Sequence, residues 1–241
     1  MIIDTLSHVG PRKNLDFKPE NWRELMKKNN IDKALVCCQM ELTDNKHTYE
    51  ILKDYPEFYG MGTCSPWSLN CYEELDRCFK DYGFKAIKMN CLRYSIAADR
   101  YELMREPFEV ADKYNAFLVV HCLSDMFSIP SRWEKMAKEF PNVGVILSHI
   151  GVPYMSYEAI EAAYNNENIF VNTAACFPPI LKKAIERLGP SKIIYASDTP
   201  FGSLTQELRA VDYIARNEEE KEMILGLNAK KLIDRSNNIV K

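Results

Sequence analysis

The chain has 241 residues, of which 46% are hydrophobic and 27% are charged, and this balance predicts one globular domain over residues 1–241. Its formal net charge is −3 and no block of basic residues stands out, so nucleic acids and anionic membranes are not expected partners. No apolar run approaches the roughly 18 residues that a membrane-spanning helix needs. The N-terminus has no basic region followed by an apolar stretch, and the eight cysteines form no CxxC pair. We therefore expect reduced thiols and a cytoplasmic protein.

Short apolar runs alternate with amphipathic segments along the whole chain. The predicted strands are residues 2–7, 33–38, 58–64, 84–91, 116–122, 143–149, 168–174 and 192–198. The predicted helices are residues 19–30, 43–54, 70–82, 99–114, 131–140, 157–165, 179–188 and 206–235. Pro107 is expected to kink or break the helix that contains it, and Ser131 is expected to cap the helix that it begins.

This alternation of strands and helices requires right-handed crossovers and hence a parallel sheet. Eight such units predict a minimal (β/α)8 TIM barrel, in which functional residues lie at the C-terminal ends of the strands. A doubly wound open sheet is the alternative, but it usually carries a Gly-rich phosphate turn after its first strand. Residues 7–11, Ser-His-Val-Gly-Pro, do not form such a turn. The barrel is therefore the preferred interpretation.

The last predicted strand ends in a carboxylate. Because side chains alternate along a strand, Ile194, Ala196 and Asp198 share one face, and the acid lies at the C-terminal end. An unpaired carboxylate there is costly to bury, so Asp198 is expected to meet a metal, a cation or several donors. The alternative is a capping role before the next helix.

Three of the four histidines stand at the ends of other predicted strands. They are His8, His121 and His149, whereas His47 lies in a helical segment and reads as a surface residue. One histidine at a strand end is most often a packing residue, but three at equivalent positions indicate a shared site. Imidazole nitrogens with one carboxylate suit Zn²⁺, Mn²⁺ or Fe²⁺. Three protein ligands and a water form the usual open catalytic site.

Six segments carry a family resemblance over nearly the full length of the chain. They are residues 3–8 (IDTLSH), 83–90 (GFKAIKMN), 119–121 (VVH), 146–151 (ILSHIG), 196–201 (ASDTPF) and 224–232 (ILGLNAKKL). Together they resemble the amidohydrolase superfamily, especially its small single-domain barrels, which include metal-dependent hydrolases and non-oxidative decarboxylases. Two positions depart from the family pattern. Leu6 replaces the first histidine of His-x-His, and Asn90 replaces a histidine that often ends the fourth strand.

The resemblance implies a metal held by His8, His121 and Asp198, with zinc favoured over manganese or iron. It also implies that Asp198 accepts a proton from metal-activated water and that His149 orients substrate or stabilises oxyanion charge. The expected ligand-contacting residues near the fourth strand are Lys88, Asn90 and Arg93, with Arg93 as a clamp for a substrate carboxylate.

Some of these positions have alternative interpretations. Lys88 matches a position that is a carboxylated, metal-bridging lysine in some relatives, and it could instead be a buried lysine paired with Asp4 or Asp198. Arg93 could be a solvated loop residue. Four cysteines lie near strand ends, where a thiolate could replace the lost imidazole or the residue could simply pack: Cys64, Cys91, Cys122 and Cys176.

Three functions follow from these residues. The first is metal-dependent hydrolysis of a small ester, lactone or amide, and the second is metal-dependent decarboxylation of a small carboxylic acid. The third is a degenerate barrel that binds a small molecule without metal, because Leu6 removes one ligand. The expected partner is a small-molecule substrate, and a homodimer is compatible with the resemblance.

Overall fold

The computed structural model describes residues 1–12, 14–38 and 44–236. Within them, nine strands form one sheet in the order β2-β1-β3-β4-β5-β6-β7-β8-β9. Every neighbouring pair is parallel except β1 and β2, which form an antiparallel hairpin. The strands are β1 (Ile3–Arg12), β2 (Leu15–Phe17), β3 (Lys33–Cys38), β4 (Phe58–Gly62), β5 (Ala86–Met89), β6 (Phe117–His121), β7 (Gly144–Ser148), β8 (Ile169–Asn172) and β9 (Ile193–Ile194).

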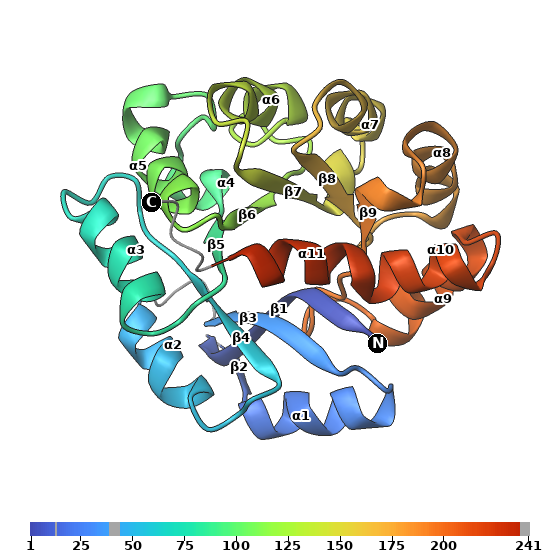
Figure 1. The fold of residues 1–241 in the computed structure, drawn as a ribbon, viewed down its shortest axis with the longest axis horizontal. Coiled ribbons are helices and arrows are strands. Elements are labelled where there is room, and N and C mark those ends of the chain that lie inside the picture. Colours follow the sequence, from blue (N-terminus) through green and yellow to red (C-terminus); the bar gives the residue numbers. More distant parts are fainter. Residues whose placement is uncertain (13, 39–43, 237–241) are drawn as a thin grey trace.

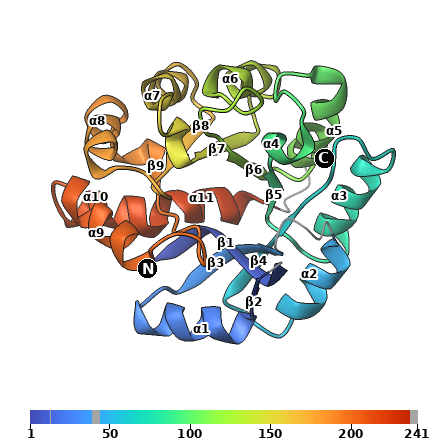
Figure 2. The same ribbon diagram turned by 180° about the vertical axis from the view of Figure 1, so that it is seen from behind.

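Helices surround this curled sheet (Figures 1 and 2). The α-helices are α1 (Pro19–Lys28), α2 (Asn45–Leu52), α3 (Cys71–Lys80), α4 (Cys91–Tyr94), α5 (Tyr101–Lys113), α6 (Pro130–Glu139), α7 (Ser156–Asn165), α8 (Pro178–Leu188), α9 (Leu204–Ile214), α10 (Glu218–Glu222) and α11 (Asn228–Arg235). Short 3-10 turns occupy His149–Gly151 and Pro190–Lys192, and one π-helical turn occupies Met223–Leu227. None of the helices in the described residues has both the length and the apolar character to span a bilayer.

The chain that follows β9 returns to β1. Thr5 N donates to Tyr195 O at 3.2 Å, Asp198 N donates to Leu6 O at 2.9 Å, and His8 N donates to Thr199 O at 2.8 Å. The first parallel strand and the last segment of the sheet are therefore hydrogen-bonded, which brings His8 beside Asp198. The predicted α/β class with parallel strands is confirmed.

Two apolar cores lie on the two sides of the strands. The larger core packs the outer faces of the strands against the surrounding helices. The smaller core fills the interior with side chains such as Leu6, Leu35 and Phe117, together with Leu232 and Ile233 of α11. Figure 1 shows α11 crossing the middle of the helical ring. The interior of the curled sheet next to α11 is therefore apolar, and Leu6 is part of this smaller core.

Several elements differ from the predictions. The hairpin strand β2 and the single-turn helix α4 were not predicted, because segments this short carry little periodicity. The predicted helix 206–235 is three helices, and α9 ends at Ile214 before Asn217 caps α10. Helix α5 is unbroken at Pro107. Ser131 does not cap α6: the helix begins one residue earlier at Pro130, which has the fixed φ suited to a first turn.

Strand β1 continues to Arg12, beyond its predicted end at residue 7, and β9 ends at Ile194, before its predicted end at residue 198. The other predicted boundaries agree with the structure to within a few residues. The strand predicted at residues 33–38 has the observed bounds of β3. The start of the helix predicted at 43–54 falls on residue 43, which lies outside the described residues, and α2 begins at Asn45.

Candidate active site

His121, His149 and Asp198 lie at or beyond the C-terminal ends of strands, and His8 lies near the end of the parallel pairing between β1 and β3. His8 is in β1, past a shift in register between Asp4 and Ser7, and it pairs with Cys37 of β3. His121 is the last residue of β6 and is level with Ser148 of β7. His149 follows directly, and Asp198 lies four residues after β9. These segments thus bring four residues from distant parts of the sequence to one end of the parallel sheet.

His8 lies between a thiol and a carboxylate. Its Nε2 is 3.3 Å from Asp198 Oδ1, and its Nδ1 is 3.2 Å from Cys37 Sγ. Burial alone would lower the pKa of His8, but Cys37 and the Asp198 carboxylate together raise it to about 9. Burial acts on Asp198 in the opposite direction, yet the hydrogen bond and charge of His8 hold the pKa of this carboxyl below its ordinary value. At neutral pH this is an imidazolium–carboxylate pair.

His149 and His121 form a second pair, with ring centroids 5.1 Å apart and an interplanar angle of 73°. Burial is the main cause that lowers the pKa of His121 to about 3 and that of His149 to about 4, and the charge of Lys88 lowers both further. His149 Nδ1 is 3.2 Å from Ala174 O. A carbonyl oxygen only accepts, so Nδ1 carries the proton and Nε2 of the neutral ring is left as an acceptor or ligand.

Lys88 is a buried cation in this region, at 3% exposure on β5. Burial lowers its pKa, and the neighbouring Cys37 and Asp198 oppose that shift. The other two predicted contact residues are Asn90 and Arg93, which lie at the start of α4 and within it. Asn90 Oδ1 accepts from Arg93 N at 3.0 Å and caps α4, while the Arg93 side chain is exposed. These contacts do not test whether Asn90 or Arg93 binds a ligand, so both assignments stay predictions.

The backbone is left-handed at two site residues, His149 with a φ of 68° and Asp198 with a φ of 56°. Ile150, which follows His149, is also left-handed, with a φ of 46°. Non-glycine residues in this region are uncommon and carry a cost of about 1–3 kcal/mol when strained. Such conformations persist where surrounding structure imposes them, and they cluster at functional sites.

The residues fit a divalent metal in part. An imidazole nitrogen and a carboxylate oxygen 3.3 Å apart have the chemistry and spacing of two ligands of one ion. Leu6 supplies no ligand and lies in the interior apolar core. Within the described residues, no three His, Cys, Asp or Glu side chains are grouped so that they could hold a metal ion. The assignment of His121 as the third ligand stays a prediction.

Sequence reasoning assigned no site role to Cys37, and it considered Asp4 only as a partner of Lys88. Cys37 contacts His8, and the signal for it was its place at the end of a predicted strand next to the first one. Asp4 Oδ1 accepts from Leu6 N and from Ser197 N, both at 3.1 Å, and so joins β1 to the segment that carries Asp198. No local pattern in the sequence indicates that link.

The cysteines that sequence analysis singled out are all buried and free. Burial raises the pKa of Cys91 to about 12 and that of Cys122 well above its ordinary value. Such thiols are inert at neutral pH, which is typical of packing residues. His47 lies on α2 as predicted and is half-buried.

The fold is shared with solved structures of low sequence identity. A 2,6-dihydroxybenzoate decarboxylase from Rhizobium is 16% identical, with a TM-score of 0.77 over 97% of this chain and 98% of that one. A dihydroxybenzoic acid decarboxylase from Polaromonas sp. JS666 with bound manganese is 16% identical, with a TM-score of 0.74 over 97% and 96%. A probable 2-pyrone-4,6-dicarboxylic acid hydrolase from Acinetobacter baumannii is 16% identical, with a TM-score of 0.76 over 97% and 99%.

Sequence comparison gives the family. No curated protein matches the chain. A family model described as amidohydrolase matches residues 6–235, which is most of the sequence. The predicted family resemblance is thereby confirmed, and the chain belongs to the amidohydrolase family.

Proposed function

We propose that this protein is a metal-dependent hydrolase that acts on a small ester, lactone or amide, within a single domain over residues 1–241. The observation that carries the proposal is Asp198, a largely buried carboxylate held ionised by His8 at the C-terminal end of the sheet. The hydrogen bonds between the segment after β9 and β1 support a closed (β/α)8 barrel, whose interior would open at this end.

The residues have separate roles in this proposal. Asp198 accepts the proton of the attacking water, and His8 beside it keeps the carboxylate ionised. His8 does so as an imidazolium in the metal-free chain, and it would have to release that proton to serve as a neutral ligand when a metal is bound. His149, with its proton on Nδ1, accepts a hydrogen bond at Nε2 and orients the water or a substrate hydroxyl. In this tautomer His149 cannot donate to an oxyanion from Nε2. Stabilisation of developing negative charge is therefore assigned to the buried ammonium of Lys88.

The proposed cofactor is one divalent metal, with zinc, manganese and iron as candidates for a site that includes His8, Asp198 and His121. When bound, such an ion would lower the pKa of its water to about 7. Support comes from the His8–Asp198 pair and from a neighbour of the same fold that contains manganese. Metal analysis of protein purified without chelator tests this part, and absence of stoichiometric metal from a fully active preparation contradicts it.

Decarboxylation of a small carboxylic acid is the second candidate. Two neighbours of the same fold are decarboxylases of dihydroxybenzoic acids, and the buried cation of Lys88 could pair with a substrate carboxylate. Carbon dioxide release from a panel of aromatic carboxylates, compared with acid release from a panel of esters, lactones and amides, separates the two reactions. Turnover of neither panel by the metal-loaded protein would favour a binding protein over an enzyme.

A further inference from the structure

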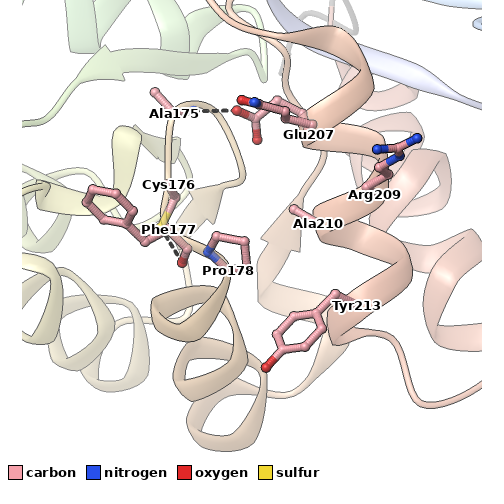
Figure 3. Close-up of a pocket in the computed structure, with 9 residues that line it drawn as sticks. Ala175, Cys176, Phe177, Pro178, Glu207, Arg209, Ala210 and Tyr213 are labelled. Carbon is pink, nitrogen blue, oxygen red and sulfur yellow. Dashed lines mark hydrogen bonds between the residues drawn. The ribbon is translucent and has the colours of Figure 1, made fainter.

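A second cavity lies apart from the four strand-end residues, between α8 and α9 (Figure 3). Its volume is about 600 Å³, large enough for a small organic molecule. The loop after β8 and the two helices supply the walls. The apolar part of the lining includes Cys176, Phe177, Pro178, Ala210 and Tyr213.

The cavity contains one buried acidic group, Glu207 of α9. The side chain is 6% exposed, although it lies in the first turn of a surface helix. Its Oε1 accepts from Ala175 N at 2.9 Å, whereas its Oε2 is buried and has no hydrogen-bond partner within the described residues. A buried carboxyl oxygen without a donor costs about 1–3 kcal/mol, so the position favours a ligand that supplies one.

The interior behind Glu207 also holds buried polar groups that lack partners. Tyr195 OH and Asp4 Oδ2 are buried without a hydrogen-bond partner among the described residues. Asp4 and Glu207 influence each other and Tyr195 electrostatically, and burial is the main cause that raises the pKa of Asp4 to about 7 and that of Glu207 to about 8. With these pKa values, Asp4 is partly protonated and Glu207 is mostly protonated at neutral pH. A cation beside Glu207 would favour its ionised form and be stabilised by it, whereas an anion would disfavour that form.

We propose that the cavity between α8 and α9 is a second small-molecule site, which takes an organic ammonium ion with an apolar body. The ammonium donates to the carboxylate of Glu207, and the apolar body lies against Pro178, Ala210 and the exposed ring of Tyr213. Figure 3 shows Pro178 facing α9 across the cavity, while the ring of Phe177 and the guanidinium of Arg209 point away from it. None of the residues assigned to hydrolysis lines the cavity, and Asp198 acts on Glu207 only through its charge.

The test uses benzylamine as the probe and phenylacetate as an anion with a similar ring. Titration of the isotope-labelled full chain, followed by NMR, should show that benzylamine shifts the backbone amide signals of Ala175, Ala210 and Tyr213. Phenylacetate should leave these signals in place. Absence of benzylamine binding, or equal shifts with phenylacetate, overturns the proposal.

A charge-removing variant and a control test how much the Glu207 carboxylate contributes to the affinity for benzylamine. Glu207→Gln keeps an oxygen for Ala175 N and removes the charge, and it should weaken benzylamine binding at least about tenfold. Glu222→Gln, at an exposed glutamate of α10, is the matched control and should bind as the wild type does. Equal affinity of the Glu207→Gln and wild-type proteins contradicts the assigned role of the carboxylate.

A second variant covers the case in which Glu207→Gln fails to fold. Tyr213 is 58% exposed, so Tyr213→Ala leaves the core unchanged. The substitution should weaken benzylamine several-fold, because the ligand loses an apolar wall. Unchanged affinity in this variant contradicts the placement of the apolar body.

Discussion

The two sides of the candidate site hold histidines in opposite charge states. His8 lies between Cys37 and the carboxylate of Asp198, and its pKa is raised to about 9. His121 and His149 are buried against each other under the influence of Lys88, and their pKa values are lowered to about 3 and about 4. Burial disfavours the charged form on both sides, so the neighbouring negative charge decides the difference. One side is thus suited to holding charge and the other to accepting hydrogen bonds.

Removal of the carboxylate should have the largest effect on this contrast. Asp198→Asn keeps the shape of the side chain but removes the base and the charge beside His8. We expect hydrolytic turnover to fall at least about 1,000-fold and the pKa of His8 to decrease. Steady-state kinetics and an NMR titration of His8 measure the two effects. Asp54→Asn, at an exposed aspartate, is the control, and full activity in Asp198→Asn refutes the assignment of the base.

The neutral histidine His149 should contribute less to turnover than Asp198 does. His149→Gln removes the imidazole Nε2 that we assign to orienting water or substrate, and turnover is expected to fall about 100-fold. His47→Gln, on α2, controls for the loss of a histidine and should keep wild-type activity. If both variants show the same kinetics, His149 has no orienting role.

The charge states also predict how stability responds to pH. His8 binds its proton more tightly in the folded chain than its ordinary pKa of 6.5 allows, so its contribution is complete below 6.5 and is lost as pH rises through about 9. His149 binds a proton less tightly, so stability falls as pH decreases from 6.5 towards about 4. NMR titration of the histidine ring protons and thermal unfolding across this range check both signs. Identical titration midpoints for His8 and His149 would contradict the opposite charge states that we assign to them.

The smallest expected change restores a ligand. Leu6→His, two residues before His8 on β1, should raise the amount of metal that copurifies with the protein, as measured by elemental analysis. Leu35→His places the same polar group in the same interior core and is the control for burial alone. An equal metal content in both variants argues against a site that includes His8.

The strand ends could be predicted from sequence because each one combines a short apolar run with an abrupt polar residue. The runs that end in His121 and His149 show this clearly, and both residues lie where the pattern placed them. Strand β9 is shorter than predicted. Only Ile193 and Ile194 pair with β8, because the chain then turns to hydrogen-bond with β1 and positions Asp198 there.

The contacts of the site depend on tertiary structure and could not be predicted in the same way. Glu207 looks like an ordinary acidic residue in the first turn of a helix, and only the packing of the loop after β8 buries it. The assignment of Asn90 as a ligand contact stays a prediction, but its capping of the first turn of α4 could not be predicted, because that element is too short to show a pattern. The pairing of Cys37 with His8 likewise required the register of β1 and β3.

The left-handed backbone at Asp198 limits what sequence variation at this position can reveal. Its amide donates to Leu6 O at 2.9 Å, and its carbonyl accepts from Phe201 N at 2.7 Å and from Gly202 N at 2.9 Å, so its conformation is fixed by neighbours on both sides. Asp, Asn and Gly adopt this conformation most readily, whereas β-branched residues such as Ile150 adopt it only rarely. A library randomised at codon 198 and sorted only for folded protein should therefore recover those three residues. Survival of aspartate in such a screen would report backbone compatibility, and only an assay of turnover would report chemistry.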